Sequence, residues 1–489
     1  MTLTIKPFHA QIVMLLIALC VNQELASQNM AQKKSDINHY INHIMERHQI
    51  PGVALAIIKD GSVIHRENYG MASLEHNVPI TEKSIFRLYS LTKPFIAVGI
   101  FQLIEENKLS LDDAVSTYIN DLPDAWNSVQ IKHLLSHSSG FPDMAPIPKF
   151  QDLSEDEAKK IVFNEPIRFM PGEKYDYNQT NFWLLQRIIE KVTNQKLEDY
   201  ILQYQFGQKE ESKEVFFSSD SRDIISNRVT PYFPFATGRR IIEHSYLQGK
   251  YFYAANGLNI TLNEFIKWDD SLNRNTLIAK ALKSKMWEAF NYSNRDQKFT
   301  YGWDQHKVNN HLSFGFSGSF VTAYRNFPRD NMSIIFLSNG LGYWYNIENI
   351  INHIASLVDE DIVDSNNFIF ESLLQVSLEE NFDSFQSTYT NLKGNTKYGN
   401  VNFEQQINYV GYMLMNLEKM HKAIAVFQMN VREYPSSWNA FDSLGEAQEK
   451  DGDNTNALRN YKKALVLNTE NKNEYNTKLK KKIKELSRR

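Results

Sequence analysis

The spacing of apolar residues changes from helical to extended near residue 50. Residues 36–49 repeat apolar side chains at the three- and four-residue spacing of an amphipathic helix. These side chains are Ile37, Ile41, Ile44 and Met45. Pro51-Gly52 ends the helix, and the apolar stretch 53–58, the turn Asp60-Gly61 and the stretch 62–65 predict a β-hairpin.

Two further strands are expected much later in the chain. Residues 312–324 and 332–337 have strand-like composition and are joined through Pro328-Arg329-Asp330-Asn331. Helical sequence, including the apolar run 94–103, lies between the early and late strands. This order predicts an α+β fold in which both ends of the domain build one antiparallel sheet and a helical subdomain is inserted between them.

After about residue 358 the sequence becomes helical and contains an internal repeat of 34 residues. The paired positions are Ile407 with Phe441, Val410 with Leu444, Gly411 with Gly445, Ala423 with Ala457, and Phe427 with Tyr461. This segment resembles tetratricopeptide repeats, in which small residues recur where paired helices cross. We expect a helical connector at 359–400 and repeats at 401–470. Two units are few for a stable stack, so residues 370–394 and the tail should complete it.

The tail, residues 471–489, predicts a basic capping helix. From Lys472 to Arg489 it has eight basic and two acidic residues, and Leu479, Ile483 and Leu486 share one helical face. A solvated basic face is favoured over a membrane- or nucleic-acid-binding tail. The repeats themselves leave two possibilities open: stability or dimerisation, or a groove for a protein or peptide partner.

The N-terminus predicts export. Lys6 and His9 precede an apolar run at 12–21, which has the length of a signal-peptide core, and Ala26-Ser27 offers a cleavage point that makes residues 1–27 a signal peptide. Cys20, the single cysteine, lies in this run, so the mature chain has no disulfide. We expect a periplasmic or extracellular protein; lipidation of Cys20 would instead make it a membrane-anchored lipoprotein.

Composition narrows the function. The chain has 489 residues, 42% of them hydrophobic and 22% charged, which is enough for a catalytic domain with an accessory domain. A net charge of −4 gives no general attraction for nucleic acid, so no nucleic-acid partner is expected.

Ser90-Leu91-Thr92-Lys93 is the only Ser-x-x-Lys quartet in the chain. It lies between a strand-like stretch and the apolar helical run, so Ser90 and Lys93 should share one helical face. Burial lowers the proton affinity of a lysine, which can then accept the serine proton. The quartet alone is weak evidence, and the surrounding sequence decides its meaning.

That sequence resembles the serine β-lactamase and penicillin-binding-protein family, most closely its class C and D-alanyl-D-alanine carboxypeptidase or esterase branch. The matching blocks run in order through 36–358: Pro51-Gly52-Val53, Asp60-Gly61, Phe86 to Pro94, Leu109 to Asp113, His133 to Gly140, Pro171 to Tyr177, and Leu337 to Gly340. The resemblance implies a serine hydrolase domain at 36–358, with a β-lactamase/transpeptidase-like sheet flanked by helices. It implies no metal and no organic cofactor.

The resemblance also implies a Tyr-x-Asn element whose tyrosine acts as general base with the lysine. Here it reads Tyr177-Asn178-Gln179. Tyr177 therefore joins Ser90 and Lys93 as a candidate catalytic residue. Gln179 replaces the usual asparagine and keeps an amide that can contact Lys93 or the substrate.

A third family element, Lys- or His-x-Gly, corresponds to Phe316-Ser317-Gly318. These three residues are candidate substrate contacts, with Gly318 allowing an acyl group close to the backbone. The backbone N–H groups of Ser90 and Ser319 are expected to form the oxyanion hole. Phe316 cannot bind a substrate carboxylate, which favours a neutral ester, amide or D-peptide.

His133 and His137 have the i, i+4 spacing of metal ligands but no evident third ligand, so we expect them to be structural. The favoured function is an exported serine hydrolase that forms an acyl-enzyme on a small-molecule or peptide substrate. The alternatives are a D-alanyl-D-alanine carboxypeptidase, a β-lactamase, or a catalytically inactive receptor that binds a partner through its repeats.

Overall fold

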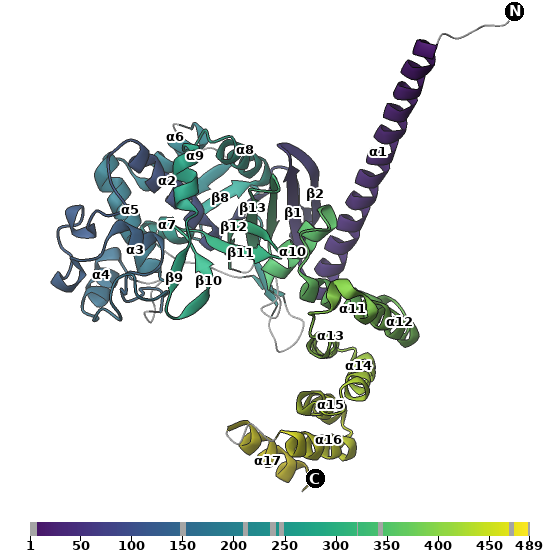
Figure 1. Cartoon of the computed structure of the whole chain (residues 1–489). Helices are drawn as coiled ribbons and strands as arrows, with labels where there is room; N and C mark the ends of the chain where they lie inside the picture. Colours follow the sequence, from purple (N-terminus) through teal and green to yellow (C-terminus); the bar gives the residue numbers. More distant parts are fainter. Residues whose placement is uncertain are drawn as a thin grey trace, which may run out of the picture. The chain divides into compact units, whose positions relative to one another are not determined.

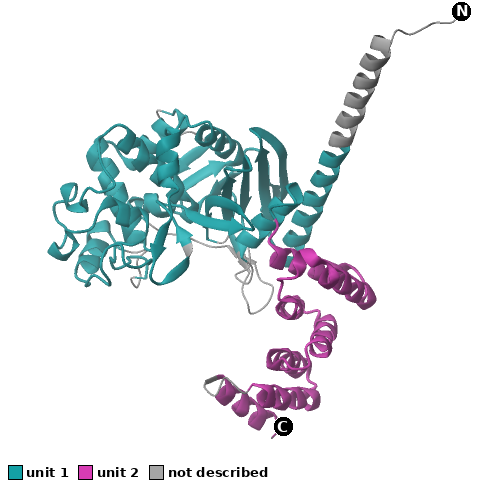
Figure 2. Cartoon of the chain, in the orientation of Figure 1, with its two compact units in different colours: residues 1–362 teal, residues 363–489 magenta. Residues whose placement is uncertain are grey.

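A computed structural model describes residues 7–146, 153–208, 214–234, 241–243, 249–319, 321–340, 346–468 and 474–487. The chain divides into two compact units, residues 1–362 and 363–489, which Figure 2 colours separately. We call them the N-terminal unit and the C-terminal unit.

The N-terminal unit is built on a nine-stranded antiparallel sheet (Figure 1). Its strand order is β3-β2-β1-β14-β13-β12-β11-β10-β9. The early strands are β1 (Gly52–Lys59), β2 (Ser62–Ser73) and β3 (Val78–Pro79). The late strands are β9 (Phe290–Tyr292), β10 (Arg295–Phe299), β11 (Asp304–Val308), β12 (His311–Gly318), β13 (Thr322–Phe327) and β14 (Met332–Ser338).

The early hairpin joins the late strands through β1 and β14, which pair with Val53 opposite Ser338 and Lys59 opposite Met332. This confirms the α+β fold class in which one antiparallel sheet is assembled from both ends of the domain. Every residue of β14 is buried, because helices pack on both faces of the central strands. α1 (Pro7–His48) and α10 (Ile347–Val358) pack against each other, and α10 contacts β13 and β14; α8 (Leu262–Asn273) contacts β1 and β14.

The structure corrects one strand expected from the sequence. Residues 312–324 do not form a single strand: β12 ends at Gly318 and β13 begins at Thr322. Ser319, between them, has a φ of 47°, in the left-handed region where a strand cannot continue. The chain turns back here, so that Gly318 pairs with Thr322. The turn places the end of β12 beside the segment that carries Ser90, because β12 contacts the short helix at that position.

The inserted helical subdomain lies between the early and late strands, at the left of Figure 1. Its helices are α2 (Lys93–Glu105), α3 (Ile131–Leu135), α4 (Glu155–Phe163), α5 (Gln179–Thr193), α6 (Leu197–Phe206), α7 (Tyr253–Asn256) and α9 (Lys280–Met286). Two small sheets accompany them, formed by β4 (Ile85–Arg87), β8 (Leu258–Thr261) and β5 (Val215–Phe217), and by β6 (Tyr232–Pro234) and β7 (Ile241–Glu243). α2 is buried along nearly its whole length, which anchors its first residue, Lys93, in the core.

The C-terminal unit is helical throughout the part that the structure describes. Its helices are α11 (Ser365–Glu379), α12 (Phe382–Gly394), α13 (Phe403–Asn416), α14 (Met420–Glu433), α15 (Trp438–Asp451), α16 (Asn454–Leu467) and α17 (Glu474–Leu486). The two copies of the 34-residue repeat form the helix pairs α13–α14 and α15–α16. In α17, Leu479 and Leu486 are buried in one cluster with Tyr461 and Ala464 of α16; a capping role for this helix remains a prediction. The tetratricopeptide-like assignment and the domain bounds remain predictions.

The described N-terminal sequence belongs to α1, which runs as one helix from Pro7 to His48. Among the described residues, no helix is long and apolar enough to cross a membrane. Signal-peptide cleavage after residue 27 and lipidation of Cys20 remain predictions.

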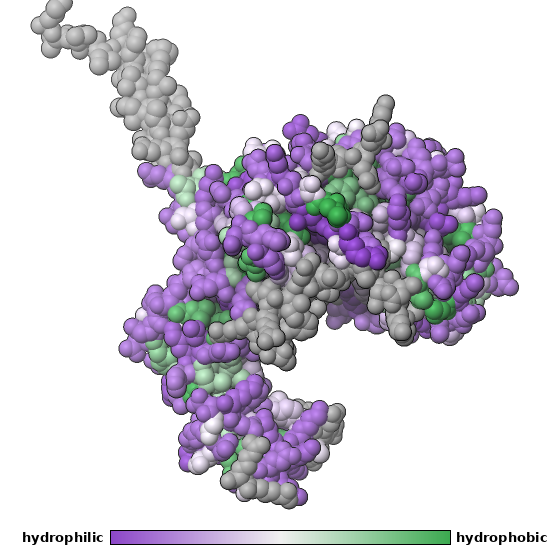
Figure 3. Space-filling model, turned by 180° about the vertical axis from the view of Figure 1, so that it is seen from behind, coloured by the Kyte–Doolittle hydropathy of each residue, from purple (hydrophilic) through white to green (hydrophobic). Residues whose placement is uncertain are grey.

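The face of the molecule shown in Figure 3 is largely hydrophilic, with apolar residues in small separate groups.

Candidate active site

Ser90 lies on a short 3₁₀ helix, η1 (Tyr89–Thr92), that leads directly into α2. Tyr89 has a φ of 51°, a left-handed conformation that is unfavourable for a bulky residue. Its ring is buried and lies 5.1 Å from the guanidinium carbon of Arg87, which helps to hold this strained turn. The turn connects β4 to η1 and α2 and leaves Ser90 at the start of a helix, where backbone N–H groups favour negative charge.

Lys93 is fully buried, and its ammonium nitrogen has three polar neighbours. Nζ lies 3.4 Å from Ser90 Oγ, 2.9 Å from Gln179 Oε1 and 2.9 Å from the carbonyl oxygen of Ala255. Desolvation lowers the pKa of Lys93 to about 7, against a smaller opposing effect of the Asp143 carboxylate. In the neutral amine, two N–H groups can donate to Gln179 and Ala255, which leaves the lone pair for Ser90.

Tyr177 forms a second contact with Ser90. Its hydroxyl donates to Ser90 Oγ at 2.8 Å, and its ring centroid lies 4.9 Å from Lys93 Nζ. Burial raises the pKa of Tyr177, so the phenol stays protonated at neutral pH. The structure thus brings together Ser90, Lys93, Tyr177 and Gln179, although the sequence separates the first two from the last two by more than 80 residues.

The His137 ring packs against the ring of Tyr177. It is fully buried, its ring centroid is 4.6 Å from that of Tyr177, and Nδ1 accepts the backbone N–H of Asn178 at 3.2 Å. Burial lowers the pKa of His137 well below its usual value, so a neutral ring packs there. His133 accepts the backbone N–H of Gln130 at the start of α3. Both contacts fit the structural role expected from the sequence, and His137 additionally positions Tyr177.

The end of β12 contributes Phe316 to the site, next to Tyr177. Phe316 is 5% exposed; its ring stacks on that of Tyr177 at 6.2 Å and meets Phe299 edge-on at 6.0 Å. The position that carries a cation in the resembled family is therefore part of an aromatic wall. Ser317 pairs with Ala323 on β13.

Gly318 has a structural reason to be glycine beyond the expected substrate contact. A Cβ at this position would lie 2.0 Å from the carbonyl oxygen of Leu88, two residues before Ser90. Thr322 also donates to that carbonyl at 3.1 Å. The absence of a side chain lets β12 pack directly on the segment that carries the serine. Ser319 follows at once, and its share in an oxyanion hole stays a prediction.

Two further residues of the site, Asp143 and Ala255, are not among those predicted from the sequence. Asp143 Oδ1 accepts the backbone N–H of Gln179 at 2.9 Å, which places this carboxylate at the start of α5 beside the site. Its signal was its position directly after the block that ends at Gly140. Ala255 contributes only its backbone carbonyl, for which the side-chain sequence holds no signal.

Comparison with known proteins agrees with this geometry. The Beta-lactamase family profile matches residues 37–353, well over half of the chain, so the chain belongs to this family. Penicillin-binding protein 4* of Bacillus subtilis is 31% identical over 176 residues, which cover 35% of this chain and 38% of that protein. The match thus spans little more than a third of its length.

Solved structures share the fold. The octameric penicillin-binding protein homologue from Pyrococcus abyssi matches with a TM-score of 0.57 and 24% identity, over 70% of this chain and 81% of that one. D-amino acid amidase from Ochrobactrum anthropi, complexed with D-phenylalanine, matches with a TM-score of 0.56 and 18% identity, over 67% and 99% of the two chains. Together, the family and the fold define a β-lactamase-related serine hydrolase in general terms.

Proposed function

We propose that this protein is an exported serine hydrolase that works through an acyl-enzyme, with Ser90 as nucleophile and Lys93 with Tyr177 as general base. One observation carries the proposal: Lys93 Nζ and the Tyr177 hydroxyl converge on Ser90 Oγ, at 3.4 and 2.8 Å, in a buried setting. A nucleophile within hydrogen-bond reach of a base that is itself held by other groups is the arrangement that activates serine.

The reaction follows from these contacts. Neutral Lys93 takes the Ser90 proton as Oγ attacks the substrate carbonyl, and the tetrahedral oxyanion is stabilised by the backbone N–H groups of Ser90 and Ser319. As the intermediate collapses, the proton passes from Lys93, directly or through the Tyr177 hydroxyl, to the leaving group. Water then attacks the acyl-serine with the same base, releasing the acid and restoring Ser90.

The aromatic side chain of Phe316 limits the class of substrate that the site can bind. A buried phenylalanine offers no charge-assisted hydrogen bond to a carboxylate, a contact worth about 1.5–3 kcal/mol elsewhere. We therefore favour a neutral ester, amide or D-peptide over the carboxylate-bearing substrates of a D-alanyl-D-alanine carboxypeptidase or a β-lactamase. The D-amino acid amidase that shares this fold is compatible with an amide.

Export to the periplasm or the cell exterior, and a protein or peptide partner at residues 401–470, belong to the same proposal. A receptor that has lost catalysis is the competing function. The intact contacts of Ser90, Lys93 and Tyr177 favour the enzyme, because a buried lysine costs stability if it serves no purpose.

A covalent-labelling experiment tests the proposal. The mature protein should react with a fluorophosphonate probe and hydrolyse a chromogenic short-chain ester, and Ser90→Ala should abolish both. Ser62→Ala, on an exposed position of β2, is the matched control and should retain both activities. Equal labelling of Ser90→Ala and wild type would remove Ser90 from the mechanism, and a wild-type protein that reacts with no probe would favour the receptor.

A further inference from the structure

We propose that Asp143 is a specificity-determining residue that selects substrates carrying a protonated amine close to the scissile carbonyl. This inference rests on the proposed hydrolase function, and it names the substrate class of the same site. It starts from the Asp143 carboxylate, which lies beside Lys93 and which, among the described residues, has one oxygen without a donor and no ion pair.

Hydrogen bonds hold the segment that carries Asp143 against the start of α5. Asn178 Nδ2 donates to the carbonyl of Phe141 at 2.6 Å, and Thr180 Oγ1 donates to the carbonyl of Pro142 at 2.8 Å. The backbone N–H of Met144 in turn donates to Thr180 Oγ1 at 3.1 Å. The residues on both sides of Asp143 are therefore held by one helix end, and the carboxylate has a fixed position.

Among the residues that the structure describes, hydrogen-bond donors contact one oxygen of this carboxylate. Oδ1 accepts the backbone N–H groups of Gln179 at 2.9 Å and of Ala145 at 3.2 Å. Across the described residues, no donor contacts Oδ2, and the side chain keeps partial exposure. An ionised carboxylate accepts about four hydrogen bonds, so Oδ2 remains available to a ligand.

The carboxylate lies next to the reacting groups. Gln179 links them, because its backbone bonds Asp143 while its side chain accepts from Lys93 Nζ at 2.9 Å. The Asp143 carboxylate nevertheless forms no ion pair with Lys93, whose Nζ contacts Ser90, Gln179 and Ala255 instead. The charge of Asp143 also reaches the Tyr177 hydroxyl, where it contributes to the raised pKa.

No other cation in the described structure neutralises Asp143 at short range. Arg168 acts on it only at a distance, because its guanidinium pairs with Asp176 at 2.8 Å. Phe316 supplies no charge where a cation is expected. When Lys93 is in the neutral form that base catalysis requires, the Asp143 carboxylate gives the site a negative charge.

Holding α5 does not require this charge. Asn178 already caps the helix by accepting the N–H of Asn181, and a neutral amide could accept the N–H of Gln179 equally well. Burial raises the pKa of Asp143, so its ionised form is partly desolvated at a cost in stability. A substrate ammonium group that donates to Oδ2 would offset that cost and orient the adjacent carbonyl toward Ser90. An anionic substrate would be repelled.

A competition experiment with two amides of nearly the same shape tests this inference. Alaninamide and isobutyramide differ by an ammonium group in place of a methyl group, and at pH 7.5 most of the alaninamide is still protonated whereas most of Lys93 is neutral. Both are measured as inhibitors of the hydrolysis of a neutral p-nitrophenyl ester by the full mature chain. We expect the inhibition constant of alaninamide to be about tenfold or more below that of isobutyramide.

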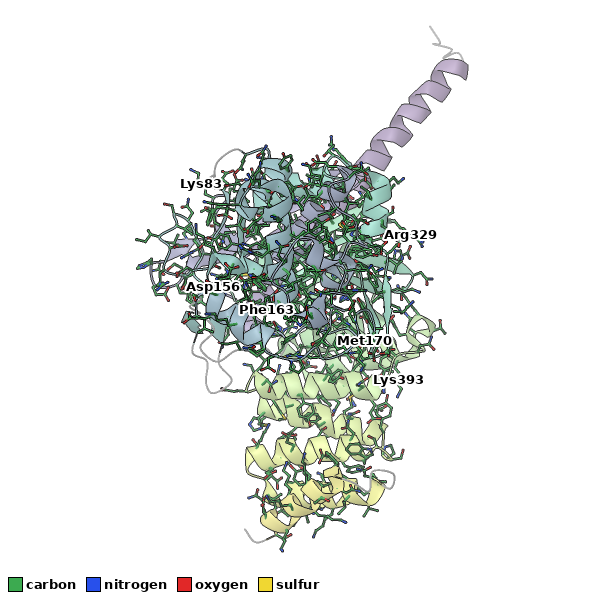
Figure 4. The ribbon with its side chains drawn as sticks, turned by 90° about the vertical axis from the view of Figure 1, so that its left-hand side faces the viewer. Lys83, Asp156, Phe163, Met170, Arg329 and Lys393 are labelled. Carbon is green, nitrogen blue, oxygen red and sulfur yellow. The ribbon has the colours of Figure 1, made fainter. Side chains whose placement is uncertain are left out.

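Three variants locate the effect. Asp143→Asn keeps the acceptor for Gln179 and should remove the preference for alaninamide, whereas Asp143→Glu keeps the charge and should retain some of it. Asp156→Asn removes the same charge from the exposed surface of α4 and should leave the preference unchanged; Figure 4 labels this side chain. Asp143→Asn should also lower the pKa of Lys93, because the Asp143 carboxylate raises it. A less charged Lys93 would repel the ammonium group less, so loss of the preference for alaninamide cannot come from Lys93.

The outcomes separate the two proposals. Ester hydrolysis without any preference for alaninamide in the wild type overturns the inference and leaves the hydrolase function intact. A preference that survives in Asp143→Asn also overturns it, because the amine is then recognised elsewhere. Absence of ester hydrolysis and of probe labelling in the wild type overturns the proposed function itself, and the inference with it.

Discussion

At the scale of single residues, the protonation of Lys93 sets when the site can act. Burial holds its pKa at about 7, and only the neutral amine can take the Ser90 proton. Tyr177 stays protonated, because burial raises its pKa. The two groups that contact Ser90 Oγ are therefore in the protonation states that base catalysis requires at mildly alkaline pH.

This gives a prediction for the pH dependence of hydrolysis. For a neutral ester, kcat/KM should rise about tenfold per pH unit below pH 7 and level off above it, because protonated Lys93 cannot act as a base. The measurement is a stopped assay between pH 5.5 and 8.5, with the rate of Ser90→Ala subtracted to remove spontaneous hydrolysis. A kcat/KM that does not change, or that falls with increasing pH, would exclude Lys93 as the base.

The residues of the site differ in how far the sequence reveals them. Ser90, Lys93 and Tyr177 lie in short blocks whose order is enough to recognise, and Gln179 and Phe316 stand out as exceptions within such blocks. The importance of Asp143 depends on a contact with the start of α5, 36 residues away. Sequence spacing carries no information about such a tertiary contact.

At the scale of elements, β12 and the serine-bearing turn form one packed unit. The carbonyl of Leu88 accepts from Thr322 and lies where a Cβ of residue 318 would be. The turn at Ser319 was hidden in the sequence, because residues 312–324 are apolar or small almost throughout. A left-handed serine has no side-chain signature of its own, so a continuous strand was the natural prediction.

The packing of β12 predicts a large effect of one methyl group. Gly318→Ala should destabilise the N-terminal unit by about 1–3 kcal/mol and reduce ester hydrolysis, because its Cβ would push Leu88 and the adjoining Ser90 turn away from β12. Thermal unfolding and kcat/KM measure the two effects. Gly394→Ala, at the end of α12 with no atom within 4 Å of its added Cβ, is the control and should change neither. If Gly318→Ala keeps the wild-type thermal stability and kcat/KM, the contact between β12 and Leu88 can accommodate an added methyl group.

At the scale of the whole molecule, the chain forms two compact units, and the candidate site lies in the first of them. The site draws its residues from η1, α2, α5, α7, β12 and the segments before α5, all of them within residues 1–362. The C-terminal unit repeats one packing solution: Gly411 lies against the ring of Phe427, and Gly445 against the ring of Tyr461. The 34-residue periodicity was visible in the sequence because the same glycine–aromatic contact is built twice.

Because the site residues all lie in the N-terminal unit, we predict that the C-terminal unit can be destabilised without changing the chemistry. A Cβ on Gly445 would lie 2.8 Å from the Tyr461 ring, so Gly445→Val should force α15 and α16 apart at a cost of about 1–3 kcal/mol. Hydrogen exchange should quicken at residues 438–467 and stay unchanged in α2, while kcat/KM for a small neutral ester stays within about twofold. Gly394→Val adds the same side chain where nothing lies within 4 Å and should leave exchange at 438–467 unchanged. A parallel loss of ester hydrolysis in Gly445→Val would show that the catalytic site depends on the helical repeats, and would make them part of the enzyme's mechanism.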